Sequence, residues 1–170
     1  DGVDDVIDCG SGPSLELKGD LTLQAWIKPT DMGWAGAAIV GKSYNQYQLL
    51  YSTRGLCWWY VGMGSNSVGN KLPLDQWWHV TGTYDGDRRR IYINGRLAGS
   101  AKSPAPKAGG ANFFMGGVGQ KFFQGQVDNV RVYDRALSEV EMVSDFKREA
   151  PEYGYDPVWF DRLRVTPYYY

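Results

Sequence analysis

Asp128 is an acidic residue in a predicted strand, residues 126–133, whose apolar positions are Val127, Val130, Val132 and Tyr133. A carboxylate that is half-buried at a sheet edge is unfavourable unless it is paired or coordinated. Two explanations are open. Asp128 either accepts hydrogen bonds from backbone N–H groups or from Arg131, or it is coordinated to a cation.

A second group of residues has the chemistry of a carbohydrate-binding surface. Exposed aromatic rings offer flat apolar faces on which sugars stack, and Asn or Gln amides hydrogen-bond to sugar hydroxyls. Trp58 and Trp59 are consecutive in a predicted strand, so they face opposite sides of the sheet and one of them belongs to the core. For every ring, simple packing is the alternative. The candidate rings are Trp34, Tyr44, Tyr47, Trp58, Trp59 and Phe122, and the candidate amides are Asn45, Gln46, Asn66 and Asn70.

Catalytic chemistry has little support in the sequence. Hydrolysis of a glycosidic bond requires two carboxyl groups that flank the bond. Glu139 and Glu141 lie in a predicted helix after the last strand, where they cannot face a cleft. His79 is the only histidine, and no nucleophile accompanies it. The sequence therefore predicts a protein that is not an enzyme.

The composition excludes two classes of partner. The chain has 170 residues, with 18 Lys and Arg against 19 Asp and Glu. Because nucleic-acid affinity depends on clustered basic residues, we expect no nucleic-acid partner. The run Arg88–Arg90 lies beside Asp85 and Asp87, and we interpret it as a solvated hairpin tip rather than an anion site. No run approaches the roughly 20 apolar residues of a membrane span, so we expect no membrane insertion.

The elements that position these residues are predicted to be short strands. Leu21–Ile27 alternates with a period of two and ends before Pro29. Asn94-Gly95 predicts a two-residue hairpin turn, because both positions tolerate positive φ. Ser138 begins the one predicted helix, with acidic residues in its first turn, and Gly62–Lys71 is predicted to be a loop. The other predicted strands are Val3–Cys9, Ala38–Lys42, Tyr47–Ser52, Leu56–Val61, Trp77–Tyr84, Arg89–Ile93, Arg96–Gly99, Asn112–Gly116 and Gln126–Tyr133.

These elements predict an all-β fold: a two-sheet antiparallel jelly-roll sandwich with one short helix near the C-terminus. In Trp77–Tyr84, odd-numbered residues such as His79 face one side and Val80 and Tyr84 face the other, but alternation does not say which side is the core. Cys9 and Cys57 are too few for a disulfide framework. Free thiols are favoured, and a single bridge stays open.

Several blocks resemble the laminin-G-like domains of the concanavalin A-like superfamily. They occur in that family's order over residues 1 to 145. The resemblance implies the jelly-roll fold named above. In related jelly rolls, an Asp at the position of Asp128 holds a structural Ca²⁺ with oxygens of the first strand, so the resemblance implies Asp1, the Gly2 carbonyl or Asp4 as partner ligands. The matching blocks are Asp1–Asp5, Leu23–Pro29, Gln76–Gly86, Ile91–Arg96, Phe123–Tyr133 and Arg135–Ser138.

We therefore expect a jelly roll over residues 1–150 and an aromatic C-terminal extension, residues 151–170, that packs on the same or a neighbouring domain. The expected function is a non-catalytic binding or adhesion module at the cell surface or outside the cell, with a glycan or surface polysaccharide as partner and a structural calcium ion. The alternative is a structural subunit of an extracellular filament or surface assembly, in which copies of the chain bind one another through the extension.

Overall fold

The computed structural model describes residues 5–31, 36–43, 45–52, 56–62, 68–118 and 121–156, with only the backbone at 56, 58, 68–70 and 118. A helix, α1 (Glu139–Glu149), follows the last strand and leads into a short 3₁₀ helix, η2 (Ala150–Tyr153); another, η1 (Pro13–Leu15), lies near the N-terminus. The strands are β1 (Ile7–Asp8), β2 (Leu21–Pro29), β3 (Ala37–Gly41), β4 (Tyr47–Tyr51), β5 (Leu56–Val61), β6 (Val68–Lys71), β7 (Trp78–Tyr84), β8 (Arg88–Ile93), β9 (Arg96–Lys102), β10 (Phe114–Met115), β11 (Gly117–Val118), β12 (Lys121–Phe122) and β13 (Gly125–Tyr133).

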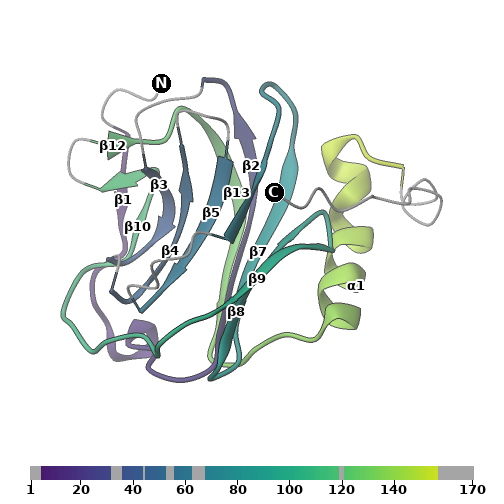
Figure 1. The fold of residues 1–170 in the computed structure, drawn as a ribbon. Helices are drawn as coiled ribbons and strands as arrows, with labels where there is room; N and C mark the ends of the chain where they lie inside the picture. The colour runs from purple at the N-terminus through teal and green to yellow at the C-terminus, as the bar shows by residue number, and fades with distance from the viewer. Residues whose placement is uncertain are drawn as a thin grey trace.

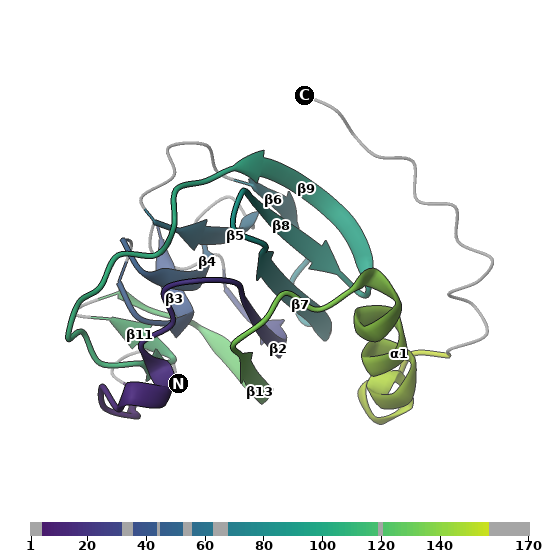
Figure 2. The same cartoon turned by 90° about the horizontal axis from the view of Figure 1, so that it is seen from below.

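The strands form two large antiparallel sheets that face each other. The six-stranded sheet has the order β1-β10-β3-β4-β5-β6, the five-stranded sheet has the order β13-β2-β7-β8-β9, and β11 and β12 make a separate pair. Figures 1 and 2 show that α1 lies against the outer face of the five-stranded sheet. The predicted all-β, two-sheet antiparallel sandwich with one helix near the C-terminus is confirmed.

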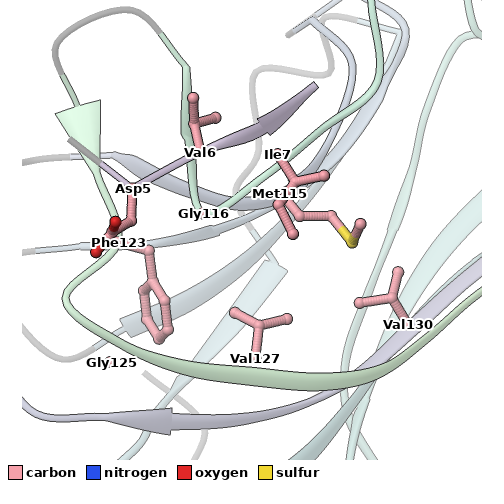
Figure 3. A pocket seen from close by; sticks show the side chains of 9 residues that line it. All are labelled: Asp5, Val6, Ile7, Met115, Gly116, Phe123, Gly125, Val127 and Val130. Atoms are coloured by element: carbon pink, nitrogen blue, oxygen red, sulfur yellow. The ribbon is translucent and has the colours of Figure 1, made fainter. Parts of the chain in front are cut away.

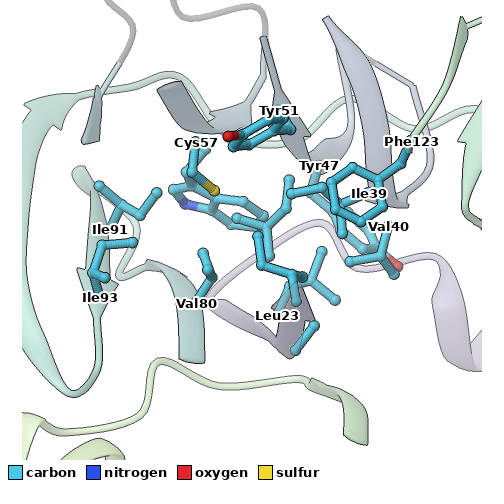
Figure 4. Close-up of a cluster of buried hydrophobic side chains, with 14 of the residues drawn as sticks. Leu23, Ile39, Val40, Tyr47, Tyr51, Cys57, Val80, Ile91, Ile93 and Phe123 are labelled. Atoms are coloured by element: carbon cyan, nitrogen blue, oxygen red, sulfur yellow. The ribbon is translucent and has the colours of Figure 1, made fainter. Parts of the chain in front are cut away.

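The core lies between the two sheets, and strand alternation explains its composition. In β2, the residues at every second position from Leu21 to Ile27 are fully buried in this core, as the sequence predicts. Trp59 of β5 enters from the other sheet, and its Nε1 donates to the Thr83 carbonyl at 3.0 Å. Its indole ring packs on Gly82, where a side chain would leave no room. Figure 4 shows this cluster, including Tyr47, Tyr51, Cys57 and Phe123.

The structure also resolves which face of β7 is the core. Val80 and Tyr84 point into the core, so His79 and Thr81 lie on the opposite face, beneath α1. Trp26, paired with His79 in the neighbouring strand, stacks on Phe146 of α1 with ring centroids 5.7 Å apart. The helix therefore covers a second, smaller aromatic cluster on the outer face of the five-stranded sheet.

The turn and cap predictions are confirmed. Asn94 and Gly95 both have positive φ, 49° and 73°. The Ser138 side chain accepts from the Glu141 backbone N–H, and the Glu141 carboxylate accepts in return, which is a capping box.

Three predictions need correction or refinement. The segment Gly62–Lys71 is not all loop, because Val68–Lys71 pairs with β5 as strand β6; backbone pairing stabilises it without an alternating pattern. Arg89 is fully buried rather than part of a solvated hairpin tip, because it shares the inward face of β8 with Ile91. Both cysteines are free thiols, Cys57 in the core and Cys9 exposed.

Candidate functional site

The outer face of the six-stranded sheet carries polar and aromatic residues in register. In β4, Tyr47, Leu49 and Tyr51 enter the core, so Gln48 and Leu50 face away from it. Gln48 pairs with Tyr60 of β5, and Leu50 pairs with the backbone of Trp58. We call Gln48, Leu50 and Tyr60 the outer-face group.

Gln48 is the residue of this group whose hydrogen bonding is incomplete. Its side chain is only 2% exposed, and its amide nitrogen, Nε2, has no hydrogen-bond partner. A buried donor without an acceptor costs about 1–3 kcal/mol, and such groups are rare in folded proteins. Tyr60, its neighbour in register, is half-buried. An acceptor would complete this arrangement, although the Gln48 amide is closed to solvent in this structure.

The predicted sugar-binding residues whose side chains the structure describes do not gather in one place. Tyr47 is in the core, fully buried, and its hydroxyl donates to the Leu15 carbonyl at 2.8 Å, so its ring is not offered to a ligand. The expectation for Tyr47 was wrong because alternation turns it inward. Asn45 lies half-buried in the turn between β3 and β4, whereas Phe122 lies half-buried on β12.

Other members of the predicted set have structural roles or fall outside the described residues. The Gln46 amide donates to the Gly109 carbonyl at 2.8 Å and so links β4 to the loop after β9. Trp59 is a core residue. Trp34, Tyr44 and Asn66 lie outside the described residues, as do the side chains of Trp58 and Asn70.

Sequence reasoning missed Gln48 and Tyr60, although a signal was present. Residues 47–51 alternate in the same way as Leu21–Ile27, and placing Tyr47 in the core assigns Gln48 to the outer face. Alternation alone, however, left both assignments open.

A cavity of about 370 Å³ lies between the free edges of the two large sheets. Figure 3 shows that β1 and Met115 border it on one side and β13 on the other. Its lining is apolar apart from Asp5 and backbone atoms: Val6, Ile7, Met115, Gly116, Phe123, Gly125, Val127 and Val130.

Asp128 faces away from this cavity. It alternates with Val127, which lines the cavity, and it pairs with Trp26 on the α1 side of the sheet. Its Oδ2 accepts from the Tyr153 hydroxyl at 2.9 Å, and its Oδ1 accepts from the Asn129 backbone N–H at 2.7 Å. Each carboxylate oxygen therefore accepts one hydrogen bond from the protein.

Of the residues expected to hold calcium, the structure describes only Asp128. The Asp128 carboxylate accepts hydrogen bonds from protein donors. Asp5 is the described acidic residue of the N-terminal segment, and it lies on the cavity side. Among the residues that the structure describes, no group of three or more His, Cys, Asp or Glu side chains is arranged to hold a metal ion. Asp1, Gly2 and Asp4 lie outside the described residues. The calcium site stays a prediction of the family resemblance.

The contact between Asp128 and Tyr153 is expected to stabilise the docking of η2. Asp128→Ala and Tyr153→Phe should each lower the free energy of unfolding by about 1 kcal/mol. The double variant should lose little more than either single variant, because both remove the same hydrogen bond. Urea denaturation measures this cycle. The hydrogen bond alone gives the same values with Ca²⁺ and with EDTA, so running both shows whether the carboxylate also binds the ion. If Asp128→Ala were destabilising only in the presence of Ca²⁺, Asp128 would be a calcium ligand instead.

Polar side chains accompany the aromatic contacts between α1 and the five-stranded sheet. The Trp26 Nε1 donates to the Glu149 carboxylate at 2.7 Å, and Arg131 forms an ion pair with Glu149 at 2.5 Å. His79 is 1% exposed, and neither of its ring nitrogens has a hydrogen-bond partner. Burial lowers the pKa of His79 to about 4, despite the opposing effect of Glu149 and Asp145. At neutral pH this histidine is an uncharged packing residue.

Glu141, one of the two helix carboxylates considered for catalysis, has structural partners. Glu141 caps α1 and pairs with Arg135 at 2.8 Å. Together with the Ser138 bonds, Arg135 holds the pKa of Glu141 at about 2. Glu139 lies in the same first helical turn. In the part of the chain that the structure describes, no helix has the length and apolar character to cross a membrane.

Comparisons with known proteins agree with this architecture. A family model described as "Concanavalin A-like lectin/glucanases superfamily" matches residues 1–142. Mouse pappalysin-1 is 25% identical over 177 aligned positions, which are 81% of this chain and 11% of that protein.

Solved structures share the fold at low sequence identity. The binding domain of Paraclostridial Mosquitocidal Protein 1 has a TM-score of 0.69 at 17% identity, over 84% of this chain and 41% of that one. Domain 4 of an extracellular arabinanase from Geobacillus stearothermophilus, in complex with arabinotriose, has a TM-score of 0.61 at 21% identity, over 77% of this chain and 68% of that one. The chain thus spans about a tenth of the curated relative and less than half of the first structure.

Proposed function

The chain belongs to the concanavalin A-like lectin/glucanases superfamily, and we propose that it is a non-catalytic carbohydrate-binding module that works outside the cell or at its surface. This fold hosts many activities, so the proposal depends on the site and not on the fold. The arabinanase domain bound to arabinotriose supports a glycan as ligand and an extracellular setting. Glu141 caps helix α1, and this structural role supports a function without catalysis.

The observation that carries the proposal is the unpartnered amide of Gln48 on the outer face of the six-stranded sheet. The half-buried ring of Tyr60 lies next to Gln48 in register and is the part of the group that a ligand can reach directly. The Gln48 amide, 2% exposed, would meet a sugar hydroxyl only after the residues that cover it move aside. Binding of a glycan would therefore satisfy a buried donor at a place where an apolar ligand would leave it unsatisfied.

A substitution of Gln48 separates binding from folding. Gln48→Leu removes the unsatisfied donor, so the variant should be at least as stable as the unchanged protein. Its affinity for the best ligand of a glycan array should fall about tenfold, which is the loss of roughly 1.4 kcal/mol. Tyr60→Ala should weaken binding further through the loss of ring contact.

The matched control is Gln126→Leu, which makes the same chemical change at an exposed position of β13. Isothermal titration calorimetry on the three variants should leave the affinity of Gln126→Leu unchanged. An array without any bound glycan would contradict the proposed function. Equal affinities for Gln48→Leu and Gln126→Leu would contradict the outer-face group as the site.

A further inference from the structure

Arg89 of β8 is a fully buried cation without an anionic partner. Among the described residues, no carboxylate forms an ion pair with it or affects its pKa, which burial lowers and the Tyr60 hydroxyl raises. The segments that follow β5 and β9 cannot supply a carboxylate either, because residues 62–74 and 103–113 contain no Asp or Glu. The guanidinium stays charged at neutral pH. A buried charge is unfavourable unless it is paired, so packing alone does not account for Arg89.

The two neighbouring arginines of β8 have partners of their own. Arg90 forms an ion pair with Asp85, and the Nε of Arg88 donates to the Ser100 Oγ at 3.0 Å. Both arginines are half-buried on the outer face of the sheet, as their alternation with Arg89 requires. The basic run that the sequence predicts to be a solvated hairpin tip therefore consists of two partnered arginines and one buried, unpaired arginine.

The hydrogen bonding of Arg89 leaves one edge of its guanidinium without a partner. Nη1 donates to the Ser103 Oγ at 3.4 Å. In the part of the chain that the structure describes, Nε and Nη2 have no hydrogen-bond partner. Their N–H groups lie on the same edge of the planar guanidinium and point in parallel. Two parallel N–H groups match the two oxygens of a carboxylate, which binds such an edge through two hydrogen bonds.

Arg89 lies close to the protein surface in spite of its burial. Ser103, which accepts from its Nη1, begins the loop after β9, and the next two residues, Pro104 and Ala105, are exposed. The Ser103 Oγ in turn donates to the Val61 carbonyl at 2.6 Å, which closes this loop against the end of β5. A carboxylate would reach Arg89 when the loop moves aside, and such local openings need much less free energy than unfolding.

We propose that Arg89 forms a second ligand site, which binds a carboxylate group on the guanidinium edge of Nε and Nη2. The carboxylate accepts both N–H groups and neutralises the buried charge. A spherical anion such as chloride neutralises the charge but does not match two parallel donors, so the site prefers a carboxylate. A small organic acid and an acidic sugar both carry this group, and the test distinguishes them. This inference does not depend on the glycan site beside Gln48.

Thermal unfolding in a Tris buffer, with sodium acetate or sodium chloride added at equal ionic strength, tests the proposal. Acetate should raise the Tm of the unchanged protein more than chloride does, and the rise should level off as the site fills. Arg89→Met removes the guanidinium edge and the buried charge, so it should lose this response to acetate. Arg90→Met is the matched control, because it makes the same change at the partnered arginine of the same strand, and it should keep the response.

A second variant and a direct binding measurement make the test independent of changes in stability. Arg89→Lys keeps the charge without the two parallel N–H groups, so it should bind acetate about tenfold more weakly. Saturation-transfer NMR on the acetate methyl group measures this binding.

Sodium glucuronate in place of acetate identifies the source of the carboxylate. A similar rise in Tm assigns the site to an acidic sugar, and no rise assigns it to a small free acid. Equal responses of the unchanged protein to acetate and to chloride would overturn the proposal. Equal acetate responses of Arg89→Met and Arg90→Met would also overturn it.

Discussion

Gly82→Ala is expected to destabilise the domain by about 3 kcal/mol, near the upper limit for overpacking a core. A Cβ atom at this position would lie 2.2 Å from Cδ2 of the Trp59 ring. Trp59 has no room to move away, because it is fully buried and its Nε1 is bonded to the Thr83 carbonyl at 3.0 Å. The indole ring and the glycine therefore depend on each other across the two sheets.

Urea denaturation checks this expectation: the midpoint of unfolding should fall, while the dependence of the unfolding free energy on urea concentration stays the same. Gly19→Ala is the control, since a Cβ at Gly19 would meet nothing within 4 Å and the residue is exposed. The control should shift the midpoint little. If Gly82→Ala behaved like Gly19→Ala, the packing of Trp59 described above would be incorrect.

Acidification is expected to destabilise the domain by about 3 kcal/mol through His79 alone. The pKa of His79 is lowered by burial from its ordinary value of 6.5 to about 4. The unfolded chain therefore binds a proton at a higher pH than the folded chain does. The contribution of His79 to stability is complete above pH 6.5 and is lost as the pH falls from about 6.5 to about 4.

The charges that face His79 do not reverse the lowering of its pKa. Glu149 and Asp145 favour the protonated form, Arg131 and Arg148 oppose it, and burial outweighs them all. Unfolding of the protein and of a His79→Phe variant at several pH values separates this histidine from other acid-titrating groups. The variant should lose less stability than the unchanged protein between pH 6.5 and 4.5. Parallel pH profiles would mean that His79 titrates normally in the folded state.

Local sequence signals predicted the frame of the fold. Alternation in Leu21–Ile27 identified a central strand, Asn94-Gly95 fixed the register of a hairpin, and Ser138 marked the start of the helix. Each of these signals acts over a few residues through backbone conformation or through one hydrogen bond. For that reason they can be recognised without knowledge of distant contacts.

The candidate site was less predictable because its residues depend on partners far away in the chain. The Asp128 carboxylate, for example, accepts from Tyr153, 25 residues later, a contact that no local pattern reveals. Tyr47 and Gln48 differ by one position, and only the packing of the opposite sheet decides which of them enters the core. His79 faces the side that α1 covers, which alternation alone did not reveal.

The central claim is that a glycan binds the outer face of the six-stranded sheet beside Gln48. An NMR titration of ¹⁵N-labelled protein with the best array ligand tests it most directly. We predict that the side-chain amide of Gln48 and the backbone amide of Tyr60 show the largest shifts, and that amides of β13 and α1 change little. Shifts confined to the cavity strands or to α1, with the Gln48 amide unchanged, would contradict this account.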